Sequence, residues 1–98
     1  MLTINQVRED LKEIRYYYSM QDLFDSAANT IKPLALLNKV ERYNAVIKTA
    51  PARLYILYIE LYVKNTTQRE LAYAWGYERV YITELNKRLI KYLQKTLA

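Results

Sequence analysis

The sequence contains no cysteine and no histidine among its 98 residues. These absences remove disulfide bridges, thiolate nucleophiles, most zinc sites and the side chain that most often acts as a general base. The acidic residues Glu9, Asp10 and Glu13 have several basic neighbours, and we interpret them as helix-terminal and solvent-facing charges. We therefore expect a protein that is not an enzyme and that binds no metal or cofactor.

Long apolar runs are also missing. The longest run, LYILYI, stops at Glu60, far short of the roughly 20 residues of a membrane-spanning helix. The first ten residues, MLTINQVRED, have neither the basic nor the apolar region of a secretory signal. We therefore expect a soluble, cytoplasmic protein without a membrane partner.

The composition that remains favours a folded domain with a positive surface. Hydrophobic residues make up 52% of the chain and aromatic residues 13%, so one modest, tyrosine-rich core is expected. The net charge of +5 is uneven, because residues 51–98 carry eight basic against four acidic residues. This local excess suits a polyanion such as DNA, although a role in solubility alone is an open alternative.

The spacing of apolar residues predicts an all-α fold of about six helices. We divide the chain into an N-terminal helical region, residues 1–49, and a C-terminal region, residues 50–98. In the N-terminal region, Thr3 and Gln6 resemble a capping box at the start of a helix of about four turns.

Further apolar stripes predict a short helix over residues 23–31 and a longer one over residues 36–47. Pro51 is well placed as the first residue of the next helix. That helix contains LYILYIELYV, residues 54–63, in which leucines, tyrosines and β-branched residues form three stripes. Because almost no face is left for water, we expect this helix to be buried on several sides.

The first helix carries an apolar seam that is a natural element for a homodimer or higher homo-oligomer. The seam consists of Ile4, Val7, Leu11, Ile14 and Tyr18. It would equally serve to fold the helix back onto residues 54–63, and both uses remain open. Because Tyr16, Tyr17 and Tyr18 occupy successive positions about 100° apart, at least one of them should be exposed or covered by a partner.

The only glycine, Gly76, separates two helix-forming segments. Thr67 and Glu70 form a capping-box pattern before a helix of about two turns, residues 68–75. Gly76 then stands where a left-handed residue lets the chain turn sharply, and a second helix begins near Glu78. This spacing is typical of a helix-turn-helix, whose second helix enters the DNA major groove. An ordinary helical hairpin with a glycine cap is the alternative.

The angle between these two helices has to be filled by apolar side chains. Ala72 supplies a small side chain where the backbones approach, and the residues expected to fill the angle are Leu71, Trp75, Tyr77, Ile82 and Leu85. With Ile82 and Leu85 pointing inward, the helical period leaves an opposite, outward face. The residues that we expect to read DNA bases from this face are Arg79, Val80, Thr83, Glu84 and Lys87.

The side chains of the outward face suit contacts with DNA. Val80 matches a thymine methyl group, Arg79 and Lys87 match guanine edges or phosphates, and Glu84 matches the cytosine amino group. The residues expected to bind the DNA backbone are Thr66, Thr67, Arg88, Lys91 and Lys95. A basic helix that is merely solvated is the alternative interpretation.

The segment from Ala50 to Leu97 resembles region 4 of bacterial sigma factors, with a helix starting at Pro51, the capped TTQRELAYAWGY and then ERVYITELNKRLIKYLQK. The resemblance covers about half of the chain. It implies that the early second helix reads the −35 promoter element, a role that falls on Arg79, Val80, Thr83, Glu84 and Arg88. Val80 and Glu84 differ from the residues usual in housekeeping sigma factors, so a different DNA sequence is expected. The length and layout are similar to phage regulators of the RinA and ArpU type, which implies the cytoplasm of a bacterial host.

We therefore predict a sequence-specific regulator of transcription, encoded by a phage, that binds double-stranded DNA. It would read the major groove with the helix from Glu78 to Lys95. The alternative is a protein-interaction module that binds RNA polymerase or a sigma factor without reading bases, because sigma region 4 also docks on the polymerase. A weaker alternative is a DNA-binding protein that takes part in genome packaging.

Overall fold

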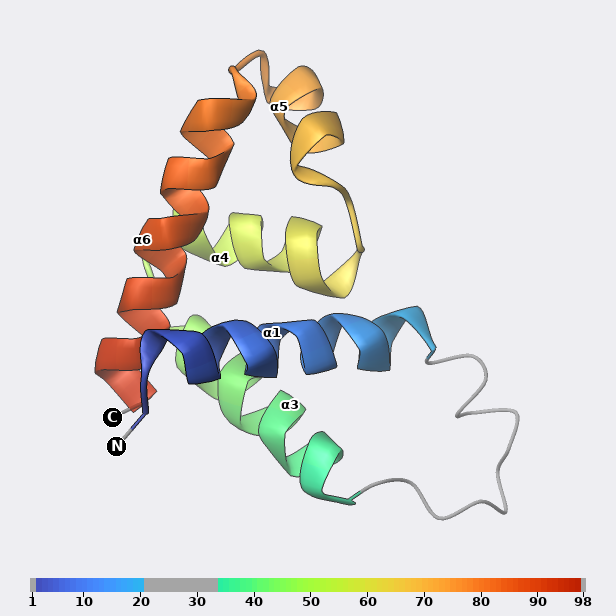
Figure 1. Ribbon diagram of the computed structural model, residues 1–98, viewed down its shortest axis with the longest axis vertical. Helices are drawn as coiled ribbons and strands as arrows, with labels where there is room; N and C mark the ends of the chain where they lie inside the picture. The colour runs from blue at the N-terminus through green and yellow to red at the C-terminus, as the bar shows by residue number, and fades with distance from the viewer. Residues whose placement is uncertain (1, 21–33, 98) are drawn as a thin grey trace.

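The computed structural model describes residues 2–20 and 34–97 (Figure 1). These residues form α-helices, one π-helical turn and no strand, which confirms the predicted all-α fold. The elements in chain order are α1 (Ile4–Ser19), α3 (Leu34–Ile47), α4 (Ala52–Tyr58), the π-helical turn η1 (Ile59–Val63), α5 (Gln68–Trp75) and α6 (Arg79–Leu97). The helix predicted over residues 23–31 lies outside the described residues.

The local signals in the sequence set where the helices begin. The Thr3 hydroxyl caps α1 by accepting a hydrogen bond from the backbone N–H of Gln6, and the Gln6 side chain donates to Asp10. Pro51 immediately precedes α4, one position earlier than predicted. The helix predicted over the LYILYIELYV segment therefore exists, but its second half widens into η1.

Helix α6 is the axis of the fold, because α1, α3, α4 and α5 all pack against it. Figure 1 shows α6 running from the top of the molecule down to the level of α1, with α4 and α1 lying across it one below the other. Helix α5 packs against the upper half of α6, and α3 lies below α1. The N-terminal and C-terminal segments also meet, since the Gln94 side chain donates to the Leu2 carbonyl at 3.1 Å.

One core joins the two halves of the sequence. Its buried residues are Val7, Leu11, Ile14, Val40, Tyr43, Ile47, Leu57, Tyr58, Leu61, Tyr62, Leu71, Ala72, Ile82, Leu85, Leu89, Ile90 and Leu93. Residues 54–63 were predicted to be buried on several sides. Four of them, Leu57, Tyr58, Leu61 and Tyr62, are buried, whereas Tyr55 and Ile56 are exposed. The described parts of residues 1–49 and 50–98 contribute side chains to this one core, so the two regions pack against each other.

The seam of α1 belongs to this core. Helix α1 packs on η1, so of the two uses that the sequence allowed, the structure shows the fold-back. Val7, Leu11 and Ile14 are each at most 1% exposed, and Ile4 and Tyr18 are partly buried against the same core. Within one chain the seam is therefore part of the core, and its use in self-association stays a prediction.

Hydrogen bonds between helices satisfy the tyrosine hydroxyls of the core. The Asn44 amide donates to Tyr18 at 2.7 Å and accepts from Tyr58 at 2.8 Å, and Tyr62 donates to Asn86 at 2.6 Å. Such partners are needed because a buried hydroxyl without one is costly. Tyr16, by contrast, is 55% exposed, as expected for at least one of the three consecutive tyrosines.

A buried carboxylate fastens α1 to α3. Asp10 is 4% exposed and accepts hydrogen bonds from Tyr43 at 2.6 Å and from Gln6 at 3.0 Å. Lys39 lies 3.1 Å from Asp10 and also pairs with Glu13. Burial acts to raise the pKa of Asp10, but the hydrogen bonds from Tyr43, Lys39 and Gln6 outweigh it and hold the pKa below its usual value. Asp10 is therefore a charged core residue, contrary to its interpretation as a solvent-facing charge.

Gly76 ends α5 in the left-handed conformation that the sequence predicts, with φ of 73°. The N–H of Tyr77 donates to the Ala72 carbonyl at 2.9 Å, which satisfies the end of the helix. A Cβ at residue 76 would meet no other atom within 4 Å, so a side chain there would be penalised by the backbone conformation alone.

We expect Gly76→Ala to lower the free energy of unfolding by about 1–2 kcal/mol, the cost of a left-handed residue that carries a Cβ. Gly76→Asn should lose less, because asparagine tolerates this conformation better. Urea unfolding of the three proteins measures both effects. Equal losses for alanine and asparagine would show that the left-handed backbone is not the reason for the glycine.

Candidate nucleic-acid interface

Helices α5 and α6 are held at their junction by a cap and a small apolar cluster. The predicted capping box is complete, because Thr67 and Glu70 exchange two hydrogen bonds of 3.1 Å. The predicted filling of the angle is correct for the buried Leu71, Ala72, Ile82 and Leu85, and Trp75 is partly buried against the same core. This cluster fixes how the first turn of α6 projects from the molecule.

Tyr77 does not fill the angle, which corrects its predicted position. Its side chain is 45% exposed, and its ring centroid lies 4.6 Å from that of Tyr81. The hydroxyl of Tyr81 in turn accepts a hydrogen bond from Arg53 of α4. The left-handed turn carries Tyr77 outward, so it covers the outside of the junction.

The outward face of α6 lies where the helical period places it. Arg79, Glu84 and Lys87 are exposed, and Val80 is 69% exposed in the first turn of the helix. Glu84 and Lys87 form an exposed ion pair of 3.3 Å, and such pairs contribute little to stability. These four side chains are therefore available to a ligand without cost to the fold.

Thr83 differs from the other predicted base-reading residues. Its side chain is half-buried, and its hydroxyl donates to the Gln68 amide oxygen at 2.8 Å. This bond links α6 to the start of α5. Thr83 therefore positions the two helices relative to each other, and only part of its side chain faces outward.

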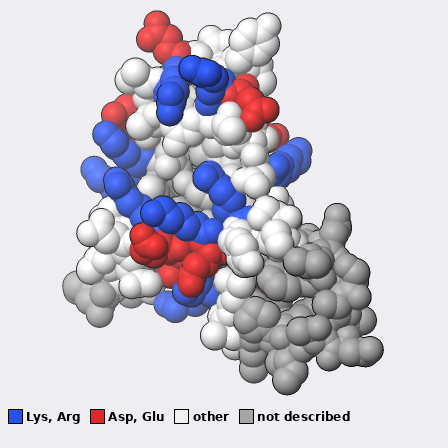
Figure 2. All heavy atoms as spheres, turned by 45° about the vertical axis from the view of Figure 1, so that its right-hand side comes forward, with Lys and Arg blue, Asp and Glu red and all other residues white. Residues whose placement is uncertain are grey.

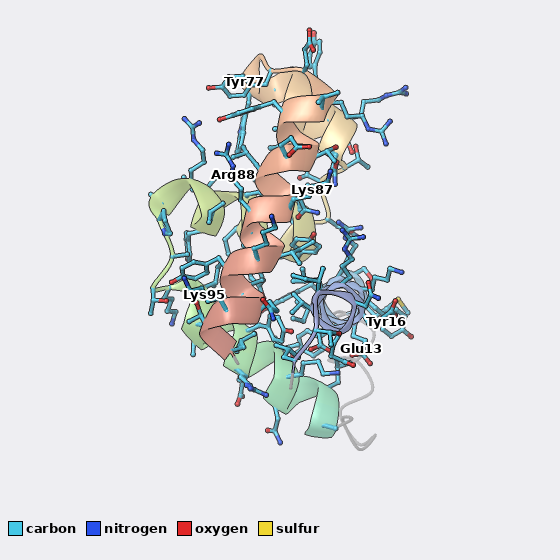
Figure 3. The ribbon with its side chains drawn as sticks, turned by 60° about the vertical axis from the view of Figure 1, so that its left-hand side comes forward. Glu13, Tyr16, Tyr77, Lys87, Arg88 and Lys95 are labelled. Atoms are coloured by element: carbon cyan, nitrogen blue, oxygen red, sulfur yellow. The ribbon has the colours of Figure 1, made fainter. Side chains whose placement is uncertain are left out.

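The residues predicted to bind the DNA backbone fall into two groups. Thr66 and Thr67 lie at the start of α5, where the Thr66 hydroxyl donates to Glu60 at 3.1 Å. Arg88, Lys91 and Lys95 are exposed along α6. Figure 3 shows Lys87 and Arg88 projecting from different sides of α6, so positive charge lies on the outward face at Lys87 and beside it at Arg88.

A hollow at the start of α5 brings together arginines from three helices. Arg15 of α1, Arg69 of α5 and Arg79 of α6 line it, together with Thr66 and Thr67. Arginine side chains and the N–H groups of a helix start both suit phosphate. Two arginines that the sequence analysis did not select, Arg15 and Arg69, therefore join the predicted backbone-binding threonines.

Helix α1 supplies further basic residues that the sequence analysis did not select. Arg8, Lys12 and Arg15 recur at spacings of four and three, so they share one edge of the helix. Each of them comes one position after a residue of the buried seam. This constant offset from the seam is the sequence signal that could have identified them as one basic edge. In the view of Figure 2, Lys and Arg side chains extend from the top of the molecule to a band across its middle, and a group of Asp and Glu side chains lies directly below that band.

Comparisons with known protein families, with curated proteins and with solved structures find no significant match to this chain. Within residues 2–20 and 34–97, no helix has both the length and the apolar character needed to cross a membrane. The same residues hold no group of acidic side chains arranged for a metal ion. The function is therefore inferred from the side chains and the geometry of the surface around α5 and α6.

Proposed function

We propose that this protein is a sequence-specific regulator of transcription that binds double-stranded DNA through α5 and α6. In this proposal α5 and α6 act as a helix-turn-helix of the sigma region 4 type, and the protein is encoded by a phage. The first turns of α6 enter the major groove. The observation that carries the proposal is Val80, which is 69% exposed at the start of α6 between the cations Arg79 and Lys87.

An exposed valine there is unfavourable in water but suits contact with a thymine methyl group. Arg79 and Lys87 bring donors for guanine or phosphate to the same face, and Glu84 brings an acceptor for the cytosine amino group. Arg88, Lys91 and Lys95 flank this face and suit the phosphates on either side. The mixture of apolar, basic and acidic side chains favours sequence reading over purely electrostatic binding.

Selection from a random duplex pool tests the proposal. We expect one enriched motif, which the protein binds with a logarithm of affinity that falls linearly against the logarithm of salt concentration in fluorescence anisotropy. Two inverted half-sites about one DNA turn apart would show that two copies bind symmetrically. If no motif is enriched and all duplexes bind equally weakly, the protein does not read sequence.

A second candidate function is binding to RNA polymerase or a sigma factor without reading bases. It is favoured by an apolar hollow between α4 and α5, which Ile56, Trp75 and Tyr77 line and Arg53 borders. Ile56 is 47% exposed, and exposed apolar clusters of this kind mark protein interfaces.

A pull-down from nuclease-treated bacterial lysate separates the two functions. Recovery of polymerase subunits that Ile56→Glu abolishes and Val80→Ala leaves unchanged would favour the second function. Weaker binding to the selected duplex with Val80→Ala, and unchanged binding with Ile56→Glu, would favour the first.

A further inference from the structure

We propose that α1 is part of the same DNA-binding surface, and that a groove between α1 and α6 holds one phosphodiester strand of the duplex that α6 reads. This inference rests on the proposed function and extends it to the N-terminal half of the chain. It assigns DNA contacts to Arg8, Lys12 and Arg15, which lie outside the α5–α6 unit.

The groove lies directly beside α6. Arg8, Lys12 and Arg15 line one wall, and Asn86 and Ile90 of α6 line the other. The buried ring of Tyr62 and the side chain of Gln68 lie between them. The groove is therefore bounded by helices that share one core, so its walls are fixed before a ligand arrives.

Both ends of the groove open onto surfaces that the proposed function already uses. At one end, Arg8 shares a hollow with Lys87 and Lys91 of α6. At the other end, Arg15 shares the hollow at the start of α5 with Arg69 and Arg79. A strand lying along the groove would therefore pass cations for its whole length and stay next to the face of α6 that enters the major groove.

Arg15 is held in place by the protein itself. Its Nε donates to the Leu61 carbonyl at 3.1 Å, and its guanidinium carbon lies 4.9 Å from the centre of the Tyr62 ring. The carbonyl and the ring both belong to η1, and π-helical turns are frequent at functional sites. An arginine fixed by one of its N–H groups loses little side-chain freedom on binding and keeps other donors for a phosphate.

The charges in the groove favour an anion. Glu9 is the acidic residue among the described side chains that line it, and it forms an exposed pair with Lys12 at 3.3 Å. Burial raises the pKa of the Tyr62 hydroxyl, and the charges of Arg15 and Arg8 act to lower it. The floor of the groove therefore lies in the positive field of both arginines.

The spacing of the cations matches a nucleic-acid strand. From Arg8 to Arg15 the helix rises by roughly 10 Å, at about 1.5 Å per residue. One strand of duplex DNA carries about three phosphates over the same axial length. Three cations at spacings of four and three residues can therefore face successive phosphates, which a small anion would not require.

The test compares two double variants that remove the same charges. Arg8→Gln with Lys12→Gln removes two of the three cations from one wall of the groove and keeps Arg15. The control, Arg42→Gln with Lys48→Gln, removes an arginine of α3 and the lysine that directly follows this helix. All four side chains are exposed, and circular dichroism with thermal unfolding confirms that both variants fold. Fluorescence anisotropy with the duplex selected by the unmutated protein is measured over a range of salt concentrations.

We expect the groove variant to lose about two units of the slope of log affinity against log salt, roughly 0.9 for each phosphate contact, and to select the same motif. The control variant should keep the slope.

If the two variants bind alike while Arg79→Ala still weakens binding, the groove inference is wrong and the proposed function stands. If the unmutated protein enriches no duplex, the proposed function is wrong, and the groove inference, which rests on it, is wrong as well. A loss confined to single-stranded oligonucleotides would also overturn the inference, because the strand would then not belong to the duplex.

Discussion

Replacing both Arg79 and Lys87 with alanine is expected to weaken binding to the selected duplex by at least about 30-fold. Two lost base-edge contacts of about 1 kcal/mol each correspond to that factor, and stronger contacts would enlarge it. Both side chains are exposed, and the partner of Lys87 is the exposed Glu84. The loss should therefore come from the interface and not from the fold.

Competition between the selected duplex and a scrambled one separates reading from simple attraction. Because Arg42 and Lys48 are not among the residues proposed to contact DNA, the control pair Arg42→Ala and Lys48→Ala should leave the preference for the selected duplex unchanged. The Arg79→Ala and Lys87→Ala protein should instead lose preference for the selected duplex. If its preference is unchanged while its thermal unfolding is normal, α6 does not read bases through these two residues.

Replacing Asp10 with alanine is expected to cause the largest loss of stability, roughly 2–4 kcal/mol at neutral pH. The change leaves the buried Tyr43 hydroxyl without its acceptor and Lys39 without one of its two carboxylates. Urea unfolding at pH 7 measures the loss. Glu9→Gln, which changes an exposed neighbour, is the matched control and should alter stability little.

The same carboxylate makes a prediction about pH. The pKa of Asp10 is lowered in the folded protein, so its charge stabilises the fold above the pKa of the unfolded chain, near 4. That contribution is lost as the pH falls through the lower, folded pKa. The difference in stability between the unmutated protein and Asp10→Asn should therefore shrink as the pH is lowered below about 4. A constant difference over that range would show that hydrogen bonding of a neutral side chain, and not charge, explains the role of Asp10.

Helix caps and turns of this chain could be predicted from the sequence because the residues that determine them lie within a few positions of one another. The left-handed Gly76 and the capping box of Thr67 and Glu70 lie where the sequence places them, since each depends on residues within one turn. The outward positions of Val80 and Lys87 follow from the helical period once Ile82 and Leu85 are known to be buried.

Contacts between distant segments could not be predicted in the same way. An apolar seam has the same spacing whether it meets another chain or another helix of its own chain. The spacing of Val7 and Leu11 therefore does not predict that α1 packs on η1. The approach of Arg15 to Arg79 likewise arises only from the packing of α1 beside α6. Asp10 looked like a surface charge because its partner Tyr43 lies 33 positions away.

The most direct test of base reading by α6 is a selection from the random duplex pool repeated with Val80→Ala. Val80 is 69% exposed, so the substitution should leave the fold unchanged. We expect the variant to enrich the same motif with a weakened thymine preference at one position, because the methyl contact is removed. An identical motif with full preference at every position would show that the start of α6 does not face the bases, and would contradict the proposed function at its central point.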